Sequence, residues 1–85
     1  MYLSQEDLKI LKKAVNYNMN YIGRDEDGNI WMYEELPTKG NSYWLEPCET
    51  GIMKINNKKA LNFISWDEDE PANVTNLLFR YIYIY

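Results

Sequence analysis

The first regular pattern of hydrophobic and polar positions covers residues 5–17 and has the spacing of a helix. Leu8, Leu11 and Val15 recur at intervals of three and four residues, and the lysines of the segment lie largely off this stripe. Ser4 is a suitable N-cap, and the aspartate three residues later makes a weak capping box. We therefore expect a helix from Gln5 to Tyr17 whose buried face carries the three hydrophobic residues.

The next pattern predicts a β-hairpin. Residues 21–24 and 30–34 are rich in β-forming side chains, and residues 25–29 between them have turn composition. The step from Asp27 to Gly28 is a strong hairpin signal. We expect a hairpin that spans Tyr21 to Tyr33, in which Arg24 and the turn after it have a structural role.

The remaining central elements are predicted to be short. We expect strands over Ser42–Leu45 and Gly51–Ile55, a short helix over Asn57–Ile64, and one or two helical turns over Ala72–Leu78. Leu61 and Ile64 are expected to face inward.

The last seven residues alternate strictly, which predicts a C-terminal strand. Phe79, Tyr81, Tyr83 and Tyr85 would share one face, and Arg80, Ile82 and Ile84 the other. Because both faces are largely apolar, such a strand is either paired inside the sheet or used at an interface. We favour a place inside the sheet, with the tyrosine face partly exposed for contact.

These elements predict one α+β domain over residues 1–85. Its N-terminal helix would pack on a small antiparallel sheet of three to five strands, with short helical turns near the C-terminus. A chain of 85 residues buries only about 60% of its unfolded surface, so its stability is expected to be modest.

The charge of the chain bears on its partners. The formal net charge is −4, with a pI near 4.7. This balance argues against direct binding to nucleic acid and favours a basic protein partner or simple solubility. Cys48 is the only cysteine, no signal peptide is recognisable, and no apolar run is long enough for a membrane span. We expect a cytoplasmic protein.

The chain offers little material for catalysis or metal binding. It has no histidine, which excludes histidine-dependent triads and zinc sites. Cys48 lies close to Glu46 and Glu49, which would raise its pKa and oppose its use as a nucleophile. The acidic turn at 25–29 fails the register of a calcium loop, because glycine falls at the fourth position and leucine at the twelfth. We expect no cofactor, no metal and no enzymatic activity.

The highest local density of charged side chains is in an acidic run that follows a tryptophan and ends at Pro71. It consists of Trp66, Asp67, Glu68, Asp69 and Glu70. The run is a solvated loop, a docking site for arginine and lysine of a protein partner, or a DNA mimic whose carboxylates replace phosphates. The low net charge argues against strong mimicry, and so do lysines that dilute the negative field, namely Lys9, Lys12, Lys13, Lys58 and Lys59.

Two segments carry a resemblance to small phage and prophage proteins of low-GC Gram-positive bacteria. These proteins are characterised by an I-x-R-D-x-D-G hairpin and a later F-I-x-W-x-D-E-x-P segment. Residues 22–28 meet the first pattern, and residues 63–71 meet the second except that Glu68 and Asp69 stand in swapped order. Tyr33, Pro37 and Trp44 also fit, whereas the tyrosine-rich tail departs from the group. The resemblance implies no transferable chemistry.

Taken with the small size and acidity of the chain, the resemblance favours a phage-type protein that binds and inhibits a host protein. An anti-CRISPR or other anti-defence inhibitor would occupy a basic nucleic-acid-binding surface, such as that of a CRISPR effector nuclease, in the host cytoplasm. The expected partner-binding residues are the acidic run with Trp66, and the tyrosines Tyr81, Tyr83 and Tyr85. The alternative is a phage accessory or structural protein that forms a homo-oligomer through its tyrosine-rich strand.

Overall fold

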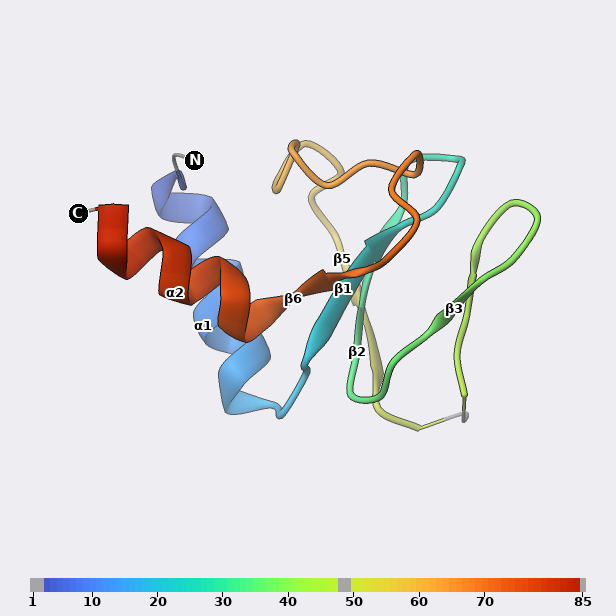
Figure 1. The fold of residues 1–85 in the computed structure, drawn as a ribbon, viewed down its shortest axis with the longest axis horizontal. Helices are drawn as coiled ribbons and strands as arrows, with labels where there is room; N and C mark the ends of the chain where they lie inside the picture. The colour runs from blue at the N-terminus through green and yellow to red at the C-terminus, as the bar shows by residue number, and fades with distance from the viewer. Residues whose placement is uncertain (1–2, 48–49, 85) are drawn as a thin grey trace.

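An antiparallel sheet lies at the centre of the molecule, with two helices at one end and a β-hairpin arm at the other (Figure 1). The computed structural model describes residues 3–47 and 50–84, and the side chains among them up to residue 80. The elements are α1 (Gln5–Asn16), β1 (Tyr21–Arg24), β2 (Ile30–Tyr33), β3 (Thr38–Lys39), β4 (Trp44–Leu45), β5 (Ile52–Ile55), β6 (Ala72–Asn73) and α2 (Val74–Ile84). The predicted α+β architecture, with its N-terminal helix and small antiparallel sheet, is confirmed.

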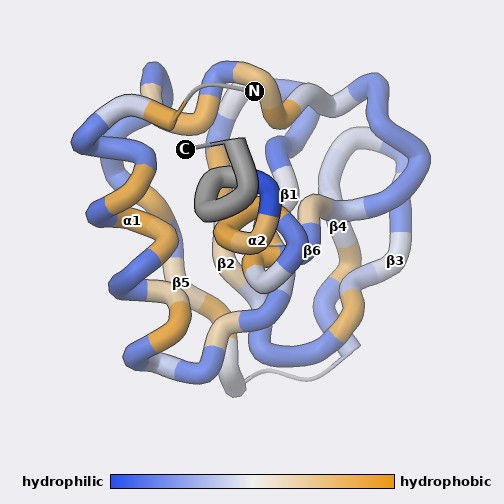
Figure 2. The backbone as a smooth tube through the Cα atoms, turned by 60° about the vertical axis from the view of Figure 1, so that its left-hand side comes forward, coloured by the Kyte–Doolittle hydropathy of each residue, from blue (hydrophilic) through white to orange (hydrophobic). Residues whose placement is uncertain are grey.

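The helix α1 begins as the sequence predicts. The side chain of Ser4 accepts a hydrogen bond from the backbone of Asp7, and the Asp7 carboxylate accepts one from the backbone of Ser4. Such a reciprocal capping box satisfies two of the donors that a helix start leaves unpaired. Hydrophobic and hydrophilic positions alternate along α1 in Figure 2, as expected for a helix with one face on the core.

The prediction that Val15 lies on the buried face is wrong, because this side chain is 51% exposed. The buried face follows Asp7, Leu11 and Ala14 instead. The reason is the turn after α1, where Asn18 has a φ of 60° and the Met19 amide donates to the Ala14 carbonyl at 2.8 Å. This Schellman-type ending folds Met19 back into the core. Met19 then covers the end of the core next to α1, and Val15 stays exposed.

The hairpin is confirmed over the predicted residues. Tyr21 lies opposite Tyr33, and Arg24 lies opposite Ile30. Gly28 has a φ of 94°, a conformation that suits glycine. The sheet continues on both sides of this pair, in the order β5-β2-β1-β6. The predicted third strand is reduced to β4, which pairs with β3 in a separate two-stranded sheet.

The core lies between the sheet and the helices. Its fully buried larger side chains are Leu11, Ile22, Ile30, Met32, Leu61 and Val74. Leu61 and Ile64 do face inward, as predicted. The predicted helix over residues 57–64 is wrong, because this segment forms a series of turns in which Leu61 has a φ of 51°. A left-handed residue inside the segment is incompatible with a continuous right-handed helix.

The predicted C-terminal strand is also wrong, because the α2 helix continues to Ile84. Residues 72–78 contain β6 and the start of this helix rather than isolated turns. The Asn73 side chain accepts a hydrogen bond from the Asn76 amide, which caps the helix start. Val74 and Leu77 are buried at helical spacing, and α2 contacts α1. Helix propagation and packing therefore override the local β-propensity of the tail. Tyr85 and the side chains of Tyr81 and Tyr83 lie outside the described part of the structure.

Candidate functional site

The acidic run forms an exposed loop between the buried Ile64 and strand β6. Ser65 shapes its start, because its side-chain oxygen accepts a hydrogen bond from the Asp67 amide at 3.1 Å. The side chains of Asp67, Glu68, Asp69 and Glu70 are all exposed. We refer to residues 65–71 as the acidic loop.

Lys39 of β3 fastens the acidic loop to the arm, the second β-hairpin, which β3 and β4 form. Its ammonium group donates hydrogen bonds to the carbonyl oxygens of Trp66 and Glu68. The same nitrogen lies 4.0 Å from the centre of the Trp66 ring and 5.2 Å from that of Trp44. The two indole rings meet edge to face, with their centres 6.3 Å apart. Charge-assisted hydrogen bonds and cation–π contacts therefore hold the loop backbone in place.

The positive charge of Lys39 is thus directed at backbone oxygens of the acidic loop. Within the described residues, no lysine or arginine nitrogen lies within 4.0 Å of the carboxylates of Asp67, Glu68, Asp69 or Glu70. Four adjacent negative charges that form no ion pair within the described residues repel one another, and a further cationic ligand would relieve that repulsion.

Trp44, which helps to hold Lys39, is itself positioned by the β1 strand and the turn after it. Its ring lies directly on Gly23, where an added Cβ would be only 2.7 Å from the Trp44 Cδ1 atom. Its amide donates to the Asp25 carboxylate at 2.9 Å, and its indole N–H donates to the Arg24 carbonyl at 3.2 Å. Trp44 is only 3% exposed, so a buried side chain anchors the arm to β1 and its turn.

The carboxylates of the hairpin turn have opposite pKa shifts. Burial raises the pKa of Asp25, partly offset by the hydrogen bond from the Trp44 amide. Hydrogen bonds from Asn29 lower the pKa of Asp27, which is fully exposed. Among the described residues, no group of three or more potential metal ligands is found. Cys48 lies outside those residues.

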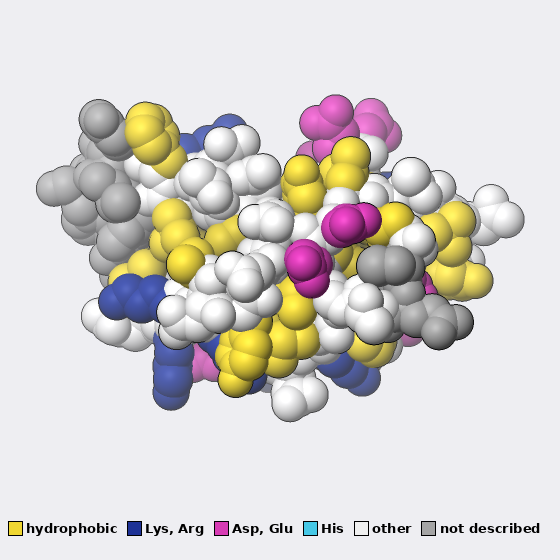
Figure 3. Space-filling view, turned by 90° about the horizontal axis from the view of Figure 1, so that it is seen from below, with side chains coloured by type: hydrophobic (Ala, Val, Ile, Leu, Met, Phe, Trp, Pro, Cys, Tyr) yellow, Lys and Arg dark blue, Asp and Glu magenta, His cyan; other side chains and the backbone are white. Residues whose placement is uncertain are grey.

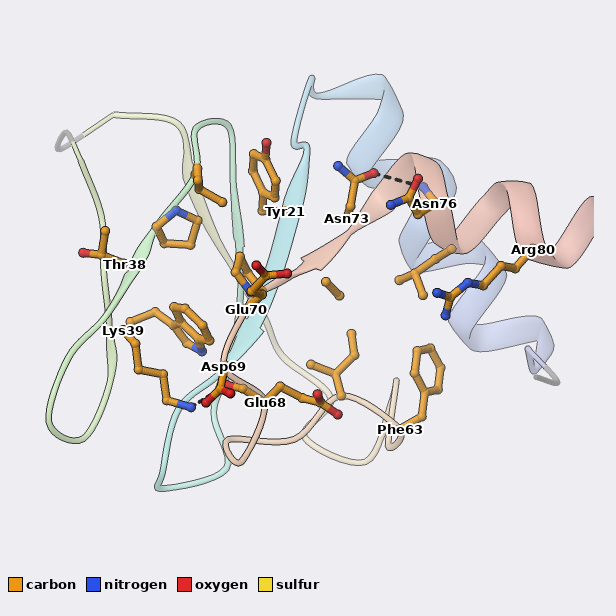
Figure 4. Close-up of a pocket in the computed structure, with 17 residues that line it drawn as sticks. Tyr21, Thr38, Lys39, Phe63, Glu68, Asp69, Glu70, Asn73, Asn76 and Arg80 are labelled. Atoms are coloured by element: carbon orange, nitrogen blue, oxygen red, sulfur yellow. Dashed lines mark hydrogen bonds between the residues drawn. The ribbon is translucent and has the colours of Figure 1, made fainter.

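A groove of about 1230 Å³ runs between the acidic loop, the arm and α2 (Figure 4). Glu68, Asp69 and Glu70 contribute to one wall, and Asn76 and Arg80 of α2 contribute to the opposite wall. Apolar side chains in the lining include those of Tyr21, Leu36, Pro37, Phe63, Ile64 and Leu77.

The structure brings five of the predicted partner-binding residues together, from Trp66 to Glu70. Trp66 is half-buried and takes part in holding Lys39, whereas the four carboxylates are free of such contacts. Sequence reasoning missed Lys39 and Trp44, because Lys39 acts on residues 27 and 29 positions away, and Trp44 is positioned by residues 19 and 20 positions away. The only local signal was the dense aromatic content of the chain.

Comparisons with known proteins add no further identification. No protein-family model matches the chain, and searches of curated proteins and of solved structures find no match either. Within the described ranges, no helix is both long and apolar enough to cross a membrane.

Proposed function

We propose that this protein binds an arginine- and lysine-rich surface of another protein through its acidic loop. The observation that carries the proposal is the arrangement of four exposed carboxylates, which form no ion pair within the described residues, on a backbone held by Lys39, Trp44 and Trp66. A loop that is already ordered loses little conformational entropy on binding. Complementary charge then accelerates association with a cationic partner.

The partner surface that fits best is one that normally binds nucleic acid. Such surfaces display clustered arginine and lysine for phosphate contacts. The net charge of −4 makes direct binding of this protein to nucleic acid unfavourable, so it would compete with nucleic acid instead. In its specific form, the proposal is a phage-type anti-defence inhibitor, such as an anti-CRISPR protein, that acts in the host cytoplasm without catalysis.

Affinity capture with matched variants tests the proposal. The test variant carries Asp67→Asn, Glu68→Gln, Asp69→Asn and Glu70→Gln. The control carries Glu26→Gln, Glu34→Gln, Glu35→Gln and Glu46→Gln, which removes the same charge at exposed positions elsewhere. Each protein is immobilised and exposed to lysate of a low-GC Gram-positive bacterium that encodes a CRISPR effector nuclease. Bound proteins are eluted with duplex DNA.

We expect wild type and control to capture a nucleic-acid-binding protein that duplex DNA releases, and the test variant to lose it. With the purified partner, association of the wild type should be faster at low salt, and this salt dependence should be smaller for the test variant. Equal capture by the test variant, or capture that DNA does not affect, would contradict the proposal. Capture of a DNA-binding protein other than a nuclease would contradict only the anti-CRISPR form.

A further inference from the structure

The groove beside the acidic loop is larger than a small-molecule site requires. Its volume of about 1230 Å³ exceeds the roughly 300–1,000 Å³ typical of pockets for small ligands. It is bounded by segments distant in sequence: the arm, the acidic loop, β6 and α2 (Figure 4). A site of this size suits a segment of polypeptide better than a compact metabolite.

The walls of the groove differ in charge. Carboxylates of Glu68, Asp69 and Glu70 line one wall, and the Lys39 ammonium beside them is directed at carbonyl oxygens. This wall attracts a lysine or arginine side chain and repels phosphate, which disfavours nucleic acid and anionic lipid as occupants. Arg80 on the opposite wall suits a carbonyl or carboxylate oxygen of the same ligand.

The lining and the sheet edge indicate the conformation of the occupant. Apolar side chains form much of the lining, including Phe63, which is half-buried, and Leu36, which is 55% exposed. Strand β6, at the edge of the sheet, lies along the groove, and sheet edges accept extended peptides. Because β6 has only two residues and follows Pro71, side-chain contacts must supply most of the affinity. The surface seen from below is similarly mixed, with acidic side chains set among hydrophobic ones (Figure 3).

We propose that the groove binds an extended segment of the partner in which basic side chains alternate with apolar ones. The inference rests on the proposed function and adds to it: the carboxylates recognise the basic side chains, and the groove recognises the apolar side chains between them. Recognition of the partner would then depend on a sequence pattern and not on positive charge alone.

Two fluorescein-labelled peptides serve as probes in an anisotropy titration. The first is a nonapeptide with alternating valine and arginine between terminal glycines, and the second has serine in place of every valine. Two variants of the protein are compared with the wild type. Asn76→Trp fills the groove from an exposed helix position and leaves the acidic loop intact, whereas Thr75→Trp places the same ring one residue away, outside the groove. Circular dichroism checks that each variant is folded.

We expect wild type and Thr75→Trp to bind the valine peptide about tenfold more tightly than the serine peptide, because valine burial adds hydrophobic free energy. Asn76→Trp should reduce the affinity for the valine peptide to that for the serine peptide. Equal binding of both peptides by the wild type would overturn the groove inference and leave the proposed function standing. The groove inference would also be overturned if Asn76→Trp still preferred the valine peptide, or if the wild type bound neither peptide. The capture experiment tests the proposed function separately.

Discussion

At the scale of single residues, Arg24 makes the densest set of polar contacts in the described part of the chain. Its guanidinium group has five N–H donors, and all five are satisfied by backbone carbonyls, those of Gly28, Lys58, Ala60, Leu61 and Ile64, at 2.7 to 3.2 Å. Burial lowers the pKa of the group. The predicted structural role of Arg24 is therefore confirmed. The side chain also holds the turns at 58–64, which lie outside the hairpin.

Replacing Arg24 with methionine should destabilise the protein by about 3 kcal/mol or more, because several carbonyls lose a charged donor at once. This would be a large part of the 5–15 kcal/mol typical of whole domains. Urea unfolding of Arg24→Met measures the loss, and Lys12→Met at an exposed position of α1 is the control. A loss below about 1 kcal/mol would show that water satisfies these carbonyls equally well.

Asp25 provides a prediction about pH. Burial raises its pKa above the ordinary 3.8, so the folded state binds this proton more readily than the unfolded state. Its contribution to stability is therefore complete below the ordinary value and declines as pH rises through the raised folded value. Asp25→Asn cannot titrate, yet its side-chain oxygen can still accept from the Trp44 amide. The melting temperature of the variant relative to wild type should increase with pH across that window.

Thermal melts from about pH 3.5 to 7 check this expectation. Asp27, whose pKa is lowered, acts in the opposite direction, but it is present in both proteins and its effect largely cancels. Glu26→Gln, at the exposed neighbouring position, is the control. A melting-temperature difference that stays constant with pH would mean that Asp25 titrates alike in the folded and unfolded states.

At the scale of elements, the hairpin depends on the backbone conformation of its turn. The Gly28 amide donates to the Asp25 carbonyl at 2.9 Å, and the φ of Gly28 is 94°. An added Cβ there would meet no atom within 4 Å, so any cost of substitution comes from the backbone alone. Gly23 is the opposite case, since its backbone is ordinary and its missing side chain makes room for the Trp44 ring.

Gly28→Val should lower the free energy of unfolding by about 1 kcal/mol or more, because β-branched residues rarely adopt positive φ. Gly28→Asn should lower it less, since asparagine tolerates this region, as Asn18 does after α1. Chemical denaturation of both variants measures the difference. Equal stability of the valine variant and wild type would remove this explanation of the turn.

At the scale of the whole molecule, two charged side chains fix one segment from opposite sides. The Asp7 carboxylate in α1 accepts the Leu61 amide at 2.8 Å, and Arg24 in β1 donates to the Leu61 carbonyl at 3.2 Å. Leu61 is fully buried with a φ of 51°. Asp7 and Arg24 thus connect α1, the sheet and the turns at 57–64 through one strained residue.

Asp7→Ala should destabilise the protein by about 2 kcal/mol, because the buried Leu61 amide loses its acceptor and the capping box is lost. In a double-mutant cycle with Arg24→Met, the combined loss should fall short of the sum by about 1 kcal/mol, since either change alone releases Leu61. Urea unfolding of the four proteins provides the cycle. Strict additivity would mean that the two side chains stabilise independent regions.

The sequence by itself determined the elements whose causes are local. The Ser4 cap and helical spacing define α1, and the Asp27–Gly28 step defines the hairpin. These features were predictable because the residues that produce them are near neighbours in the chain.

Only the tertiary structure decided the rest. The tail joins a helix because α2 packs against α1, and Val15 is exposed because the turn at Asn18 brings Met19 into the core. The contact of Lys39 with the acidic loop joins residues 27 and 29 positions apart. The groove likewise exists only where distant segments meet. The free energy of such contacts depends on which distant residues the fold brings together. A local pattern of hydrophobic and polar positions does not contain that information.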